Sequence, residues 1–66
     1  MKNNIKDLRT RYGLSQDGLA ENLKVSRQTI ISLEKGRYNP SITLAFKLAH
    51  LFNCHIEDIF IYEEDN

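Results

Sequence analysis

Two short stretches with helical spacing, residues 15–23 and 26–35, lie almost end to end, and this pair constrains the fold more than any other feature. Ser15 and Ser26 stand at the starts of these stretches, and serine is a favourable helix N-cap. Apolar residues follow at spacings that place them on one helix face, namely Leu19, Ala20 and Leu23, then Ile30 and Leu33. The connection, Lys24-Val25-Ser26, is as short as that of a helix-turn-helix unit. The sequence therefore predicts such a unit over residues 15–35.

Capping and turn residues divide the rest of the chain into further short helices. Asn4 can cap a first helix that Gly13 ends, and Ser41 can cap a fourth helix after the turn at Pro40. We expect the inward face of that fourth helix to hold Ile42, Ala45, Phe46, Ala49 and either Leu48 or Phe52. Residues 56–60 fit a short fifth helix or turn, and the β-favouring run 59–62 could instead be a brief strand. The predicted class is all-α with five helices.

The length of 66 residues and the single cysteine, Cys54, limit what can stabilise this fold. The chain is long enough for one domain, residues 1–66, and an internal disulfide is impossible. Because so small a chain is marginally stable alone, we expect association or unusually tight helix packing. No apolar run could cross a membrane and no signal-peptide pattern opens the sequence. We therefore expect a cytoplasmic protein without a membrane partner.

The formal net charge of zero conceals an uneven distribution of charge along the chain. Residues 1–40 carry a net charge of +4, whereas residues 41–66 carry −4. The basic half includes the predicted helix-turn-helix unit. An asymmetry of this kind can steer an oriented encounter with a charged partner such as nucleic acid.

The second stretch of the predicted unit carries a polar face opposite its apolar one. The residues on this face and beside it are Arg27, Gln28, Thr29, Ile31 and Ser32. Arginine pairs with guanine, glutamine with adenine, and serine or threonine with either base in the major groove. A recognition helix presents its N-terminal residues to the base edges. The pattern therefore favours sequence-specific binding of double-stranded DNA.

Residues from Asn4 to about Phe60 resemble the Cro/repressor-type helix-turn-helix domain of the XRE family. The most specific part is the run V-S-R-Q-T-I, which begins at Val25, followed by L-E-K-G-R-Y-N-P-S from Leu33. The resemblance implies a five-helix fold like that of lambda repressor. It also implies that Arg27, Gln28 and Ser32 are the main base-reading residues, with Thr29 and Ile31 as helpers.

The same resemblance implies roles for residues outside the reading face. Gln16 matches a residue that anchors a DNA phosphate at a helix N-terminus. The other expected phosphate-binding residues are Ser26, Lys35, Arg37, Tyr38 and Asn39. Arg9 and Glu34 match a structural ion pair that joins the first helix to the third.

Other chemistries have weaker support in the sequence. His50, Cys54 and His55 lie close enough to suggest a metal or thiol sensor, but packing or surface roles suit them better. No spacing marks a catalytic nucleophile, a phosphate-binding glycine loop or a metalloprotease helix. We expect neither an enzyme nor a bound metal, cofactor or small-molecule substrate.

The C-terminal segment, about residues 52–62, is unusually apolar for a chain end. We expect part of it to enter the core and the rest to form a self-complementary dimer patch of Phe52, Ile56, Phe60, Ile61 and Tyr62.

The predicted function is a dimeric repressor that reads a palindromic operator through the major groove. The alternative is an antitoxin-like or adaptor protein whose main role is to bind another protein.

Overall fold

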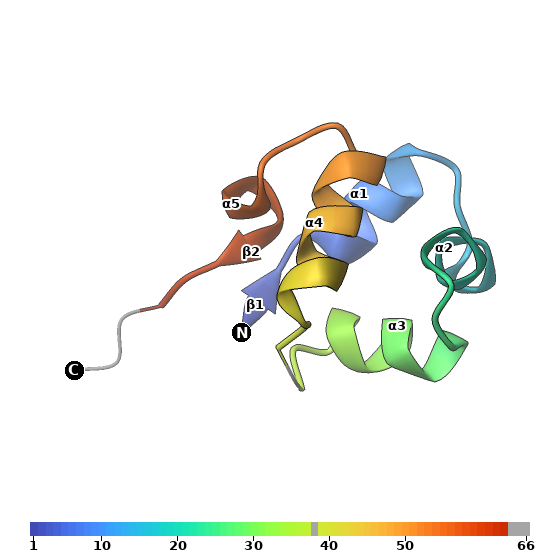
Figure 1. Ribbon diagram of the computed structural model, residues 1–66, viewed down its shortest axis with the longest axis horizontal. Coiled ribbons are helices and arrows are strands. Elements are labelled where there is room, and N and C mark those ends of the chain that lie inside the picture. The colour runs from blue at the N-terminus through green and yellow to red at the C-terminus, as the bar shows by residue number, and fades with distance from the viewer. Residues whose placement is uncertain (38, 64–66) are drawn as a thin grey trace.

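Five helices follow one another in the computed structural model, which describes residues 1–37 and 39–63 (Figure 1). They are α1 (Ile5–Arg11), α2 (Gln16–Leu23), α3 (Arg27–Glu34), α4 (Ile42–Leu51) and α5 (Ile56–Ile59). Two short strands, β1 (Lys2–Asn3) and β2 (Phe60–Ile61), complete the described part of the chain. The predicted helical class, the number of helices and the brief C-terminal strand are thus confirmed for these residues.

Serine side chains begin three of the helices, as the sequence predicts. Each serine hydroxyl accepts a hydrogen bond from the backbone N–H three residues later, at 2.9 Å for Ser15, 3.2 Å for Ser26 and 3.1 Å for Ser41. These bonds satisfy N–H groups that have no partner within the helix. Asn4 stands at the N-cap position of α1, as predicted, but its side chain makes no capping bond. The side chain of Asn3 instead accepts the N–H of Ile5, at 3.1 Å.

The turn between α2 and α3 is made by a lysine in the left-handed conformation. Lys24 has φ of 59° and ψ of 44°, and the N–H of Val25 then bonds to the carbonyl oxygen of Ala20 at 3.0 Å. A lysine in this conformation costs roughly 1–2 kcal/mol relative to a right-handed one. The turn is nevertheless held, because half-buried Val25 packs against the core and Ser26 caps the next helix.

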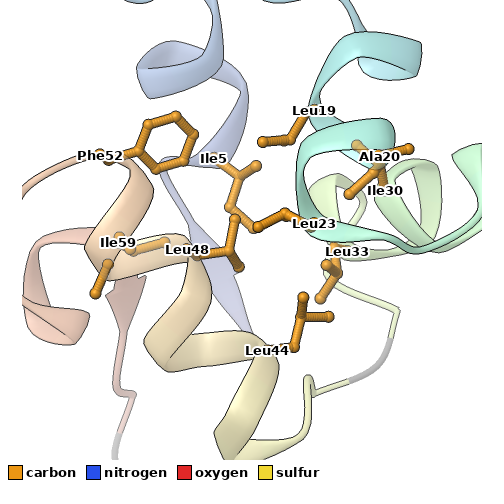
Figure 2. Close-up of a cluster of buried hydrophobic side chains, with 11 residues drawn as sticks. Ile5, Leu19, Ala20, Leu23, Ile30, Leu33, Leu44, Leu48, Phe52 and Ile59 are labelled. Atoms are coloured by element: carbon orange, nitrogen blue, oxygen red, sulfur yellow. The ribbon is translucent and has the colours of Figure 1, made fainter.

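One hydrophobic core joins all five helices. Its side chains point toward one another from helices that lie far apart in the sequence (Figure 2). The buried members are Ile5, Leu19, Ala20, Leu23, Ile30, Leu33, Leu44, Leu48, Ala49, Phe52 and Ile59. This core fixes the position of α3, which contributes two residues exposed by 1% or less.

The inward face of α4 matches the prediction at Ala45, Leu48 and Ala49 but not at Ile42 and Phe46. Leu44, Ala45, Leu48 and Ala49 are buried, whereas Ile42 is 72% exposed and Phe46 is 59% exposed. The helix is apolar around most of its circumference, so its sequence offers two stripes at helical spacing. Packing against the other helices selects the leucine stripe and leaves Ile42 and Phe46 in solvent.

The two strands bring the ends of the described chain together. β1 and β2 pair antiparallel, with Lys2 opposite Ile61 and Asn3 opposite Phe60. The next residue, Asn4, extends the pairing, because its N–H donates to the carbonyl oxygen of Ile59 at 2.7 Å. The sequence did not predict a strand at residues 2–3. Within the described residues, no helix is both long and apolar enough to cross a membrane.

Candidate nucleic-acid interface

The helix that carries the predicted reading face is anchored from its opposite side. Ile30 and Leu33 of α3 are buried against the core, and Ala20 of α2 is 5% exposed where the two helices meet. The small side chain of Ala20 allows α2 and α3 to pack closely against each other. The outward face of α3 is therefore presented from a fixed support (Figure 1).

The predicted base-reading residues divide into two groups by exposure. Arg27 and Gln28, in the first turn of α3, are exposed. Thr29, Ile31 and Ser32 are half-buried, which suits short contacts at the edge of the face better than a long reach. The hydroxyl groups of Ser26 and Thr29 lie 2.9 Å apart and bond to each other.

A largely buried ion pair joins α3 to α1. Arg9 Nε lies 2.6 Å from Glu34 Oε2, and the two side chains are only 12% and 8% exposed. Arg9 also donates from Nη1 to the carbonyl oxygen of Leu14 at 2.9 Å. The structure thus contains the pair that the sequence resemblance implied, at the end of α3 that lies farthest from Arg27.

Gln16 makes a contact that sequence reasoning missed. Its side-chain amide donates to Glu34 Oε1 at 3.0 Å, so it is the third member of the Arg9–Glu34 cluster. This bond directs the amide into the protein. The backbone N–H groups at the start of α2 are the other donors that a phosphate could meet at this position.

The loop after α3 supplies the remaining predicted phosphate contacts. Lys35, Arg37 and Asn39 are all exposed, while Tyr38 lies outside the described residues. Gly36 has φ of +70°, and a Cβ at this position would lie 2.8 Å from the carbonyl oxygen of Met1. Glycine is therefore required both by the backbone conformation and by the close approach of the N-terminal segment.

That N-terminal segment supports the recognition helix, and sequence reasoning did not assign it such a role. The side-chain amide of Asn3 donates to the carbonyl oxygen of Leu33 at 2.7 Å and so satisfies a carbonyl in the last turn of α3. Because Asn3 also pairs with Phe60, one residue links α3 to β2. No local signal could have identified this link, because Leu33 and Phe60 lie 30 or more residues from Asn3.

The structure does not support a metal or thiol sensor at His50, Cys54 and His55. No group of three or more His, Cys, Asp or Glu side chains that could hold a metal is found among residues 1–37 and 39–63. Burial, and to a smaller extent the negative charge of Asp58, raise the pKa of the Cys54 thiol. A reactive sensor thiol requires the opposite shift.

The apolar C-terminal segment is divided between core and surface. Phe52 is 3% exposed and packs in the core, where the centre of its ring lies 5.4 Å from the centre of the Tyr12 ring. The prediction that Phe52 belongs to the dimer patch is therefore wrong, because its side chain is not accessible to a partner. Ile56 and Phe60 are half-buried, whereas Ile61 and Tyr62 are 42% and 77% exposed. The free apolar surface of this segment is therefore smaller than predicted.

Comparison with known proteins places this geometry in a family. The family model described as Helix-turn-helix matches residues 5–59, which include all five helices. The chain belongs to the XRE-type helix-turn-helix family. An uncharacterized HTH-type transcriptional regulator of Methanocaldococcus jannaschii is 58% identical over 65 residues, which are 98% of each chain. Another uncharacterized HTH-type regulator, YgzD of Bacillus subtilis, is 48% identical over the full length of both chains.

A solved structure of this helix-turn-helix type shares the fold. The restriction-modification controller protein C.AhdI of Aeromonas hydrophila superimposes with a TM-score of 0.74 at 32% identity, covering 85% of each chain. The present chain is accordingly a transcriptional regulator with a helix-turn-helix DNA-binding domain and is not an enzyme. Its nucleic-acid partner is double-stranded DNA.

Proposed function

We propose that this regulator binds a palindromic operator as a cytoplasmic homodimer and represses transcription, with α3 of each copy in the major groove. The observation that carries this proposal is the pair of exposed side chains, Arg27 and Gln28, on the first turn of a helix whose other face is buried. Residues 1–66 act as one domain, in which residues 15–35 bind DNA and about 52–62 associate. A dimer that occupies a promoter excludes polymerase without any further contact, which favours repression.

The reading residues have the chemistry that base recognition requires. Arg27 can donate two hydrogen bonds to guanine O6 and N7, and Gln28 can pair in the same way with adenine N6 and N7. Ser32 and Thr29 supply hydroxyl groups, and Ile31 supplies an apolar contact for a thymine methyl group. These side chains come from consecutive turns of a single helix, so they can address neighbouring base pairs.

Phosphate binding supplies affinity and orientation in this proposal. Ser26, Lys35, Arg37 and Asn39 are exposed around α3, and the start of α2 adds the backbone donors beside Gln16. Tyr38 is proposed with them on the sequence resemblance alone. The net charge of +4 on residues 1–40 attracts the DNA backbone, while the −4 on residues 41–66 orients the molecule so that this end faces away.

Replacing Arg27 with Ala tests the reading face. We expect the affinity for the selected operator to fall by about 1–3 kcal/mol and the preference at one base position to relax, because a bidentate arginine contact is lost. The measurement is a gel-shift series on the operator, chosen from a random duplex pool with the wild-type protein, and on its single-base variants.

Lys35→Ala is the matched control for that experiment. Its loss should weaken binding to all duplexes by a similar factor and reduce the slope of log affinity against log salt by about one. If Arg27→Ala left both the affinity and the base preference unchanged, the reading face would be assigned wrongly.

The association proposed for the C-terminal segment is tested separately. Sedimentation at tens of micromolar should give a dimer for the wild type. The double variant Ile61→Ser, Tyr62→Ser should be a monomer, because it removes the most exposed apolar side chains of that segment. Phe46→Ser on α4 is the control with a similar loss of exposed apolar surface. A monomeric wild type would contradict the proposed dimer.

One observation favours the alternative role as an antitoxin-like or adaptor protein. Ile42 and Phe46 leave a second apolar area on α4, and a hollow beside Phe46 is lined by Lys24, Lys47 and His50. An area of this kind suits a protein partner. Co-purification of a second protein that Phe46→Ser abolishes, together with DNA binding that stays weak and unspecific, would support this role over the repressor.

A further inference from the structure

We propose that Asp17 determines base specificity by holding the guanidinium group of Arg27 in the orientation that reads guanine. This inference rests on the proposed function, because it takes Arg27 as a base-reading residue. Asp17 is the second residue of α2 and Arg27 is the first residue of α3, so the contact links the starts of the two helices that form the helix-turn-helix unit.

The geometry places the carboxylate nearest the Nε edge of the guanidinium group, at an ion-pair distance. Asp17 Oδ1 lies 3.8 Å from Arg27 Nε, and both side chains are exposed. An arginine can present a pair of N–H groups either from Nε and one terminal nitrogen or from the two terminal nitrogens. A carboxylate beside Nε leaves the two terminal nitrogens free, and these match guanine O6 and N7.

The side chains that precede Asp17 and Arg27 in the sequence bond to other partners and do not orient the guanidinium group. Gln16, the residue before Asp17, directs its amide to Glu34 at 3.0 Å. Ser26, the residue before Arg27, bonds to the N–H and hydroxyl of Thr29. Asp17 is therefore the acidic group that accompanies Arg27 among the ion pairs of the described residues.

The contact between Asp17 and Arg27 has two electrostatic effects. An aspartate close to the DNA-facing side repels phosphates and so weakens binding to every sequence. An arginine at the first position of a helix is also disfavoured by the helix dipole, and the nearby carboxylate offsets this. The repulsion lowers affinity for every sequence by a similar factor and leaves the ratio of specific to unspecific binding unchanged. Only the orientation of the specific contact raises that ratio.

The stability of the protein should not depend on this pair. Exposed ion pairs contribute little to the free energy of unfolding, and asparagine has nearly the shape of aspartate. Asp17→Asn is therefore expected to fold as the wild type does, and a thermal melt checks this. Changes in DNA binding can then be attributed to the interface.

The experiment compares four proteins: wild type, Asp17→Asn, Arg27→Ala and the double variant. Each is titrated against the selected operator, the variants with the guanine read by Arg27 replaced, and an unrelated duplex. We expect Asp17→Asn to raise affinity for the unrelated duplex about threefold, since one repulsive charge is removed. We expect it to lower the preference for guanine about three- to fivefold, which is the scale of one exposed ion pair.

The double variant isolates the coupling between the two residues. In the Arg27→Ala background, Asp17→Asn should leave base preference unchanged, because the oriented group is already absent. Asp7→Asn on α1 is the control, since it removes one exposed carboxylate from a helix outside the helix-turn-helix unit. That control should leave the guanine preference at its wild-type value.

Two results distinguish this inference from the function on which it rests. If Asp17→Asn raises affinity for all duplexes by the same factor and Arg27→Ala still relaxes the guanine preference, the role of Asp17 is overturned and the reading role of Arg27 stands. If Arg27→Ala leaves base preference unchanged, both are overturned.

Discussion

Replacing Glu34 with Gln should lower the free energy of unfolding by about 3–5 kcal/mol, the cost of leaving a buried charge without its partner. Arg9 and Glu34 are 12% and 8% exposed, and Nε of Arg9 lies 2.6 Å from the carboxylate. Glutamine keeps the shape of the side chain but removes its charge, so the largely buried guanidinium group loses its counter-charge and keeps only neutral polar partners, among them the Leu14 carbonyl oxygen. Gln16 would also lose a charged acceptor. Urea denaturation followed by circular dichroism measures the change.

An exposed ion pair in the same chain provides the control. Lys2 and Glu63 lie 3.6 Å apart and are 73% and 56% exposed. Glu63→Gln should therefore change the free energy of unfolding by less than about 1 kcal/mol, since water screens such pairs. Equal effects of the two substitutions would mean that burial does not distinguish the Arg9–Glu34 pair, and the anchoring of α3 through it would have to be abandoned.

Replacing Ile30 with Ala should destabilise the protein by about 2–5 kcal/mol, because it leaves a cavity beneath the recognition helix. Ile30 is completely buried and packs where α3 meets the rest of the core (Figure 2). A domain of this size has a total stability of only about 3–10 kcal/mol. The variant should therefore be partly unfolded at 25 °C. Its apparent affinity for the operator should fall in proportion to the fraction of protein that remains folded.

Two further isoleucine variants make this result specific. Ile30→Val removes one methylene and should cost about 0.5–1.5 kcal/mol, which keeps the protein folded and measurable. Ile42→Ala, at a position 72% exposed, should cost little because no cavity forms. A loss for Ile42→Ala as large as that for Ile30→Ala would contradict the assignment of the core, and a thermal melt of all three variants decides it.

Most helix boundaries could be predicted because they depend on neighbours in sequence. A serine hydroxyl caps the N–H three residues later, and this bond requires no distant contact. The exposed face of α3 followed in the same way, since Ile30 and Leu33 specify the buried side by their spacing. The short turn at residues 24–26 was also predictable, because Ser26 can cap a second helix directly after it.

The errors occurred where the sequence allowed more than one arrangement. In α4, the stripes that contain Ile42 and Phe46 or Leu44 and Leu48 have equal spacing, so periodicity could not choose between them. Phe52 was expected either on the inward face of the fourth helix or in the dimer patch. Its packing against Tyr12 decides between them and joins residues 40 positions apart. The spacing of apolar residues contains no information about such a contact.

The amino-acid sequence by itself determined the five helices, the tight turn and the residues that α3 presents outward, because short-range hydrogen bonds and helical spacing specify them. The tertiary structure decided which face of α4 is buried, that Asn3 satisfies the end of α3, and that Gln16 and Asp17 take different partners. These outcomes depend on distances between residues that only folding brings together, and side chains adjacent in sequence can then serve opposite purposes. Gln16 strengthens the buried cluster, and Asp17 faces the arginine proposed to read DNA.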